Sequence, residues 1–306
     1  MKDVRVVFMG TPDFSLAPLK LLIEKTNVVM VVTKPDAYVG RKKILTPSPV
    51  KVLAEKENIP VFTPKSIKKE YQTIIDAKPD IIITCAYGKI IPKVLIDYPK
   101  YGCVNIHASL LPKYRGAAPI QWALINGEEK TGVTLMYMDE FMDTGDIIDK
   151  VEYKINETDD IGILHDELSK LGTDLLDKNL ENLVTSNVNR IKQNDDDATY
   201  APMITNEQEL LDFNDDVIKI YNKIRAFSPW PLSKAIIKEE EIKIVKAHYE
   251  LVSSEVNKIY ASKSSLGIGC LNGIIYLDII KPVGKRNMSI KEYLNGKLEY
   301  FLDNGR

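Results

Sequence analysis

The sequence predicts an α/β domain built on an open parallel sheet, followed by a smaller domain rich in β-strands. Short runs of Val and Ile alternate with segments of helical periodicity in the first part of the chain. The last hundred residues instead contain short segments in which apolar and polar residues alternate, separated by polar turns. A length of 306 residues also exceeds the usual size of one folding unit, so two domains are expected.

The strands and helices of the first domain can be placed from these patterns. Strands buried on both faces of a parallel sheet appear as short apolar runs, which occur at residues 4–9, 28–33, 80–85 and 102–107. Helical spacing is found between the strands at 14–26, 49–57 and 67–77. Two more strands, at 132–139 and 147–153, precede a long amphipathic helix at 161–184. Residues 1–187 therefore predict a doubly wound, Rossmann-like domain.

The character of the chain changes after this domain. Residues 192–206 break both periodicities and contain Asp195-Asp196-Asp197, so we expect a linker at 188–206. A helix at 215–227 and strands at 241–246 and 273–279 follow. Residues 207–306 therefore predict a small β-barrel or sandwich.

Composition excludes several classes of protein. Hydrophobic residues make up 44% and charged residues 27%, which is typical of globular proteins. The three cysteines have no CxxC spacing, which argues against a disulfide framework or a zinc site and favours a cytoplasmic location. We see neither a secretory signal nor a membrane span. A net charge of −2 means that binding of nucleic acid would depend on local basic clusters.

The turn after the first strand argues against a dinucleotide cofactor. It reads Gly10-Thr11-Pro12-Asp13-Phe14, with one glycine and with a proline that lacks an N–H donor. Such a turn is a poor cradle for a pyrophosphate, and it can equally be a plain strand-to-helix connection.

Polar residues end the fourth predicted strand. Asn105, His107 and Ser109 would share one face if the extended conformation continues. They lie at the carboxyl end of a parallel strand, where open α/β sheets bind ligands. A single histidine is more often structural. An amide donor beside a group that titrates near neutrality is nevertheless expensive to bury, and the pair can stabilise an oxyanion and transfer a proton.

A polar loop, residues 138–146, follows another predicted strand and contains Asp143. A carboxylate from this loop could orient the imidazole of His107 and favour its charged form. The same acidic loop could equally be a solvated turn or a site for a hard cation. The spacing leaves these alternatives open.

Several motifs together resemble the formyltransferase family that uses 10-formyltetrahydrofolate. They extend over nearly the whole chain, so the resemblance does not depend on one short string. The motifs are Gly10-Thr11-Pro12-Asp13-Phe14, Thr33-Lys34-Pro35-Asp36, Thr46-Pro47-Ser48-Pro49-Val50-Lys51, Asn105-Ile106-His107-Ala108-Ser109-Leu110-Leu111-Pro112, Tyr114-Arg115-Gly116-Ala117-Ala118-Pro119-Ile120, Asp143-Thr144-Gly145-Asp146 and Arg225-Ala226-Phe227-Ser228-Pro229-Trp230-Pro231.

The resemblance implies a set of site residues. Asn105, His107 and Asp143 would be the catalytic trio, and no metal is required. The formyl donor would be 10-formyltetrahydrofolate. Its binding residues would be Ser109, Leu110, Leu111 and Pro112, with Ala86, Tyr87 and Gly88 against the pterin.

The resemblance also implies that the amine acceptor is initiator methionyl-tRNA, formylated for translation initiation. We separately expect a monomer. Arg41, Lys42 and Lys43 lie on the loop that would approach the tRNA, although three adjacent cations are often only a solvated surface. The C-terminal domain would be a barrel of the OB type that holds the tRNA. Two departures from the family pattern are a missing glycine between Arg41 and Lys42 and the presence of Phe141 where glycine is frequent.

Two other functions compete with this one. The same trio could formylate an amino sugar or glycinamide ribonucleotide, and the catalytic residues do not separate these substrates. The loop at 34–51, the motif at 225–231 and the extra domain favour the tRNA substrate. A non-catalytic RNA-binding protein is a third possibility, against which the intact trio argues.

Overall fold

The computed structural model describes residues 1–40 and 42–302, which form two compact units. Unit 1 contains Met1–Pro119, Lys130–Lys154 and His165–Pro202, and unit 2 contains Ile120–Glu129, Ile155–Leu164 and the chain from Met203 onward. Two short segments from the first half of the sequence thus belong to unit 2. Most of the segment expected as a linker, up to Pro202, belongs to unit 1.

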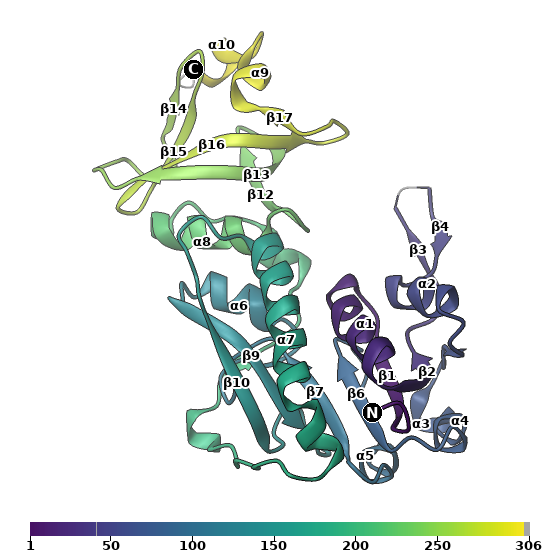
Figure 1. Cartoon of the computed structure of the whole chain (residues 1–306). Coiled ribbons are helices and arrows are strands. Elements are labelled where there is room, and N and C mark those ends of the chain that lie inside the picture. Colours follow the sequence, from purple (N-terminus) through teal and green to yellow (C-terminus); the bar gives the residue numbers. More distant parts are fainter. Residues whose placement is uncertain (41, 303–306) are drawn as a thin grey trace. The chain divides into compact units, whose positions relative to one another are not determined.

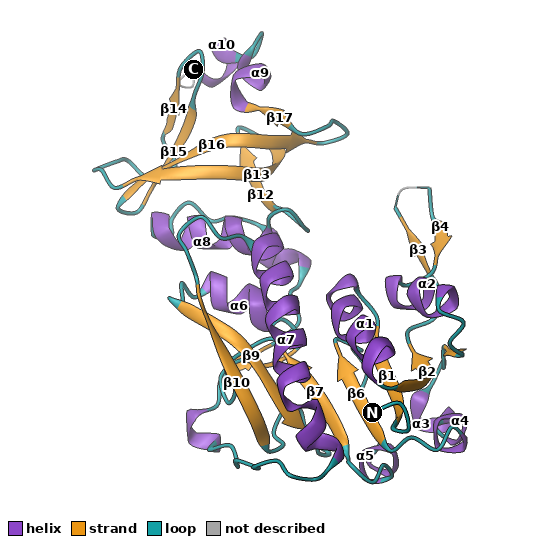
Figure 2. Cartoon of the chain, viewed as in Figure 1, coloured by secondary structure: helices purple, strands orange, loops and turns teal. Residues whose placement is uncertain are grey.

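Unit 1 is built on a seven-stranded sheet with the order β10-β9-β7-β6-β1-β2-β5 (Figure 2). The strands are β1 (Arg5–Gly10), β2 (Asn27–Val32), β5 (Val61–Phe62), β6 (Ile81–Cys85), β7 (Cys103–His107), β9 (Lys130–Tyr137) and β10 (Ile147–Lys154). The pairs β5–β2, β2–β1, β1–β6 and β6–β7 are all parallel, which confirms the predicted α/β core. The pairs β7–β9 and β9–β10 are antiparallel, so the complete sheet is mixed.

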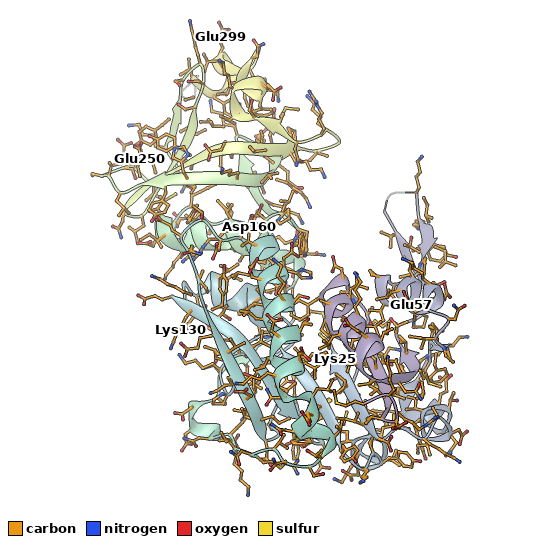
Figure 3. The ribbon with its side chains drawn as sticks, in the orientation of Figure 1. Lys25, Glu57, Lys130, Asp160, Glu250 and Glu299 are labelled. Atoms are coloured by element: carbon orange, nitrogen blue, oxygen red, sulfur yellow. The ribbon has the colours of Figure 1, made fainter. Side chains whose placement is uncertain are left out.

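Helices cover both faces of this sheet. On one face, α1 (Leu16–Lys25) and α7 (Ile161–Val184) lie side by side (Figure 1). Lys25, labelled in Figure 3, is the last residue of α1 and forms an ion pair with Asp177 of α7. Helix α7 approaches the sheet closely at Gly172, where an added Cβ would lie 2.8 Å from the side chain of Ile106. On the other face, a buried apolar cluster joins β1, β2 and β6 to the short helices α3 (Ile67–Glu70), α4 (Gln72–Asp76) and α5 (Lys93–Asp97).

The register of the parallel strands brings their carboxyl ends to one edge. Gly10 of β1 pairs with Cys85 of β6, and Thr84 of β6 pairs with Asn105 of β7. Side chains that leave the ends of β6 and β7 therefore lie next to each other, at the edge where open α/β sheets bind ligands.

Some elements of unit 1 are not apparent in the sequence patterns. Residues 34–48 include a hairpin, β3 (Ala37–Val39) and β4 (Ile44–Thr46), which precedes α2 (Pro49–Lys56) and extends away from the neighbouring helices (Figure 1). The helix expected at 67–77 is interrupted at Tyr71 and forms α3 and α4. Two-residue strands β8 (Arg115–Gly116) and β11 (Tyr200–Ala201) pair in parallel, although 85 positions separate Arg115 from Tyr200.

Unit 2 contains an antiparallel sheet with the path β12-β13-β16-β15-β14. The strands are β12 (Ser233–Ile237), β13 (Glu240–Glu250), β14 (Ile259–Ala261), β15 (Leu266–Cys270) and β16 (Gly273–Pro282), with β17 (Met288–Ser289) paired to β16. The helices are α6 (Pro119–Ile125), α8 (Val217–Phe227), α9 (Ile290–Leu294) and α10 (Leu298–Leu302). One apolar cluster joins the sheet to α8, α9 and α10.

Local contacts explain why residues 155–164 belong to unit 2. The Arg225 guanidinium of α8 donates to the main-chain carbonyls of Asn156 and Asp159. Helix α8 itself begins at a side-chain cap, because Asp216 accepts a hydrogen bond from the Ile218 N–H. Across the described parts of both units, no helix combines the length and apolar character that crossing a membrane requires.

Candidate active site

The carboxyl end of β7 carries a buried histidine whose ring is held on one side by the main chain. His107 is 6% exposed, and its Nε2 lies 2.9 Å from the carbonyl oxygen of Tyr114. A carbonyl can only accept a hydrogen bond, so Nε2 carries a proton. Tyr114 has a φ of 61°, and its own N–H donates to the hydroxyl of Thr199 at 2.9 Å. The imidazole is therefore oriented by a loop that is itself tied to the segment after α7.

The other ring nitrogen of His107 faces the carboxylate of Asp143. Nδ1 lies 3.7 Å from Oδ2 of Asp143, which is a charge contact but too long for a hydrogen bond. The same Oδ2 accepts a hydrogen bond of 2.8 Å from the main-chain N–H of Gly116. The Asp143 side chain is 15% exposed. Two of the three residues of the predicted trio thus meet, although 36 positions separate them in the chain.

The loop that carries Asp143 has a backbone conformation set by hydrogen bonds. Asp143 has a φ of 55°, in the left-handed region that residues other than glycine seldom adopt. The carboxylate of Asp139 accepts hydrogen bonds from the N–H of Phe141 and from the hydroxyl of Thr144. The side chain of Phe141 is exposed. The fold therefore needs no internal space for this side chain at a position where glycine is frequent.

Asn105 lies two residues before His107 on β7, and a strand of this kind presents both side chains on one face. Its Oδ1 accepts a hydrogen bond of 2.7 Å from the hydroxyl of Thr84, which is buried on the neighbouring strand. This bond orients the amide so that Nδ2 is left to donate elsewhere. Among the described residues, no hydrogen bond to that nitrogen is found. The arrangement therefore offers an amide donor beside the imidazole.

The predicted folate residues after β7 lie in a loop that is partly turned into the fold. The strand ends at His107, so Ser109 does not continue its alternation, and its hydroxyl donates to the Lys113 carbonyl at 2.7 Å. Leu111 is fully buried, whereas Leu110 and Pro112 are partly exposed. Thr134 of β9 fastens this loop, because its hydroxyl donates to the Ser109 carbonyl and accepts from the Leu111 N–H.

The predicted pterin-facing residues follow β6. Ala86 and Gly88 are exposed and have φ values of 49° and 72°, whereas the side chain of Tyr87 between them is buried. The Tyr87 hydroxyl has no hydrogen-bond partner within the described structure, and burial raises the pKa of Tyr87 to about 12. The side chain of Tyr87 is thus part of the apolar core, and Ala86 and Gly88 are the exposed residues of this turn.

The predicted basic loop lies at the end of the hairpin formed by β3 and β4. Lys42 and Lys43 are exposed there, and Lys43 has a φ of 46°. Arg41 lies outside the described residues. The structure brings neither lysine into contact with the trio.

Four residues that sequence reasoning missed support the trio. They are Thr84, Gly116, Gln193 and Thr199. Gly116 belongs to the motif at 114–120, and Thr84 lies two residues before Ala86, so their positions offered a weak signal. Gln193 and Thr199 come from the segment interpreted as a linker, and nothing in the sequence pattern distinguished them.

A surface hollow is found among residues that were not predicted as site residues. This hollow, in unit 2 and of about 590 Å³, is lined by residues that include Leu251, Val252, Val256 and Leu271. No group of three or more His, Cys, Asp or Glu side chains with the geometry of a metal site occurs within residues 1–40 and 42–302.

Comparison with known proteins identifies the family of the chain. The family model described as formyl transferase matches residues 4–180, and the model described as formyl transferase, C-terminal domain, matches residues 203–298. The methionyl-tRNA formyltransferase of Bacillus velezensis is 44% identical over 301 residues, covering 96% of this chain and 95% of that protein. The methionyl-tRNA formyltransferase of Bacillus subtilis is 44% identical over 300 residues, covering 95% of this chain and 94% of that protein.

A solved structure has the same fold at lower sequence identity. The N-formyltransferase from Helicobacter canadensis, in complex with folinic acid and dTDP-3-aminofucose, superimposes with a TM-score of 0.68. It is 22% identical, and the match covers 90% of this chain and 98% of that chain. At this identity the likeness is one of fold. On the family models and the curated relatives, the chain belongs to the formyl transferase family, in the group whose curated members are methionyl-tRNA formyltransferases.

Proposed function

We propose that this chain transfers the formyl group of 10-formyltetrahydrofolate to the α-amino group of initiator methionyl-tRNA, for translation initiation. The observation that carries the proposal is the meeting of His107 and Asp143 beside Asn105 at the carboxyl end of β7. In the reaction a bond forms between the amine nitrogen and the formyl carbon, the bond from that carbon to N10 breaks, and a proton moves from the amine to N10.

Asn105 has the role of a donor to the formyl oxygen. The hydroxyl of Thr84 occupies Oδ1, so the Nδ2 protons can point to the oxygen on which negative charge develops. The amide is already oriented before the reaction, which is the condition for effective electrostatic stabilisation. Removal of one such donor typically lowers kcat on the order of a hundredfold to a thousandfold.

His107 and Asp143 act as a pair. Because Nε2 is held by the Tyr114 carbonyl, Nδ1 is the nitrogen that gains or loses a proton. The protonated ring donates from Nδ1 toward the formyl oxygen, and the Asp143 carboxylate stabilises its positive charge. Asp143 also faces the incoming amine and can pass the amine's proton toward N10.

The formyl donor supplies the electrophilic carbon, and the loops after β6 and β7 would hold its folate part. The exposed main chain at Ala86 and Gly88 supports recognition of the pterin by backbone groups, since the side chain of Tyr87 points into the core. Among the four predicted folate residues after β7, Leu110 and Pro112 are the accessible ones. Ser109 and Leu111 would contribute by shaping that loop.

The tRNA would contact both units. Lys42 and Lys43 are exposed at the end of a hairpin, a position from which cations can reach phosphates, and we include Arg41 in this contact. We propose that residues 207–306 form an OB-like barrel that binds the body of the tRNA, with residues 1–187 as the catalytic domain and 188–206 as the connection. We further propose a cytoplasmic monomer. The three free and buried cysteines are consistent with a reducing compartment.

A direct assay tests the proposed function. The purified chain is incubated with 10-formyltetrahydrofolate and charged initiator methionyl-tRNA, and formylmethionine is measured after hydrolysis of the ester. We expect formylmethionine to form, and we expect His107→Ala to abolish transfer while tRNA affinity stays nearly unchanged. The absence of formylmethionine, together with formylation of a nucleotide-linked amino sugar offered in parallel, would show that the acceptor is wrong.

A further inference from the structure

The segment after α7 is fastened to the loop that carries Asp143 through a single side chain. The Gln193 amide nitrogen Nε2 donates to the carbonyl oxygens of Asp143 and Gly145, at 2.8 Å in each case. Its Oε1 accepts from Nε and Nη2 of Arg115, at 3.1 and 3.0 Å. Gln193 therefore uses both ends of its amide, one toward the loop that carries Asp143 and the other toward Arg115.

The orientation of this amide follows from its partners. A guanidinium can only donate and a carbonyl can only accept, so the oxygen of Gln193 must face Arg115 and its nitrogen must face the loop. Arg115 is 2% exposed, and a buried cation requires hydrogen-bond partners. Besides Gln193 it pairs with Asp195, whose side chain is 82% exposed.

The loop requires such a restraint because of the conformation of Asp143. A residue other than glycine with a φ of 55° persists only where surrounding contacts hold it. Gln193 binds the carbonyls of Asp143 and Gly145, while the N–H of Gly116 binds the Asp143 carboxylate. Main chain and side chain of Asp143 are thus held from two directions.

We infer that Gln193 is a positioning residue for the formyl transfer. It holds the carboxylate of Asp143 opposite Nδ1 of His107, and it does so through the main chain of the loop. This inference rests on the proposed function, because it needs a catalytic role for Asp143. The segment that was interpreted from the sequence as a linker would therefore take part in catalysis.

Three variants separate positioning from structural support. Gln193→Ala removes both sets of bonds. Gln193→Glu keeps an acceptor for Arg115 but loses the donor to the loop and places a carboxylate against two carbonyls. Asp195→Asn is the matched control, because the amide oxygen of Asn can still accept from Arg115 and the Gln193 bonds stay in place.

The full-length variants are compared with 10-formyltetrahydrofolate and methionyl-tRNA as substrates. We expect kcat to fall by about 10-fold to 100-fold in both Gln193 variants, because small misplacement of a reacting group has effects of that size. The KM for each substrate should stay within about twofold, since the groups that bind the substrates remain. Asp195→Asn should retain kcat within about twofold.

A spectroscopic measurement adds a readout that stability alone does not change. The chain has only three histidines, so selectively labelled His gives few NMR signals, and His107→Ala assigns one of them. The His107 signal should shift in Gln193→Glu, while melting temperatures report the folded fraction. A normal kcat and an unshifted His107 signal in folded Gln193→Glu would overturn the inference.

The same experiment distinguishes this inference from the proposed function. Asp143→Ala is assayed alongside the other variants. If it is inactive while both Gln193 variants, corrected for folded protein, transfer formyl at the normal rate, only the positioning role is wrong. If Asp143→Ala is fully active, the proposed role of the trio is wrong and the positioning role falls with it.

Discussion

Replacement of Asp143 by Asn tests the charge at the centre of the proposed site. The two side chains have the same shape, and the Asn oxygen can still accept the hydrogen bond that the Gly116 N–H donates to Asp143. What disappears is the negative charge, which lies 3.7 Å from Nδ1 of His107. The substitution therefore removes the stabilisation of a positive imidazole and leaves the packing of the loop in place.

The size of the effect follows from the distance and the burial. Two unit charges about 4 Å apart interact by about 4 kcal/mol at an effective dielectric constant of about 20. His107 is 6% exposed and Asp143 15%, so some contact with solvent remains and reduces this value. A range of about 2 to 4 kcal/mol corresponds to a loss of about 30-fold to 1,000-fold in kcat.

The assay is formyl transfer to methionyl-tRNA at saturating substrate concentrations, with the melting temperature measured for each protein. Asp146→Asn is the control, because Asp146 belongs to the same loop but pairs with Arg190 at 3.3 Å. We expect that control to keep kcat within about twofold. If folded Asp143→Asn retained more than about a third of the normal kcat, the electrostatic argument would be refuted.

Three further predictions concern the packing around the site. Gly116→Ala should lower kcat more than about tenfold and should also lower the melting temperature. The reason is that the new Cβ would lie 2.6 Å from the Ala201 carbonyl oxygen, at a residue whose φ is 125°. Normal kinetics of this variant would contradict the prediction. Tyr87→Phe should raise the free energy of unfolding, measured with urea, by about 1 kcal/mol, because it removes a buried hydroxyl without a partner. A free energy of unfolding below that of the unchanged protein would reveal a water bound to this hydroxyl. Burial raises the pKa of the Cys85 thiol to about 12, so at pH 8 only about one thiol in ten thousand is ionised. Iodoacetamide reacts with the thiolate, and mass spectrometry should therefore find rapid labelling of Cys85 only after the protein has been unfolded.

Local patterns in the sequence predicted the parallel core of unit 1. A strand buried on both faces must be apolar along its length, and this requirement is visible within six residues of β1 or β6. The position of Asn105 and His107 at the end of a strand followed from the same local pattern. These features could be predicted because each depends on a few neighbouring residues.

The contacts that assemble the candidate site could not be predicted in this way. Oδ1 of Asn105 is held by Thr84 from another strand, and the Asp143 loop is held by Gln193 from a segment that showed no periodicity. In the sequence pattern, Thr84 is an ordinary strand residue and Gln193 is a linker residue. The division into two units likewise depends on contacts, since residues 155–164 belong with Arg225.

The sequence by itself therefore determined the parallel strands, the family and the identity of the polar residues at the end of β7. Only the tertiary structure decided which carboxylate faces His107, how the Asn105 amide is turned and what holds Asp143 in a left-handed conformation. The physical reason is that hydrophobic burial leaves a periodic trace along the chain. A hydrogen bond between residues far apart in the chain leaves none, because it depends on where the whole fold brings its two partners.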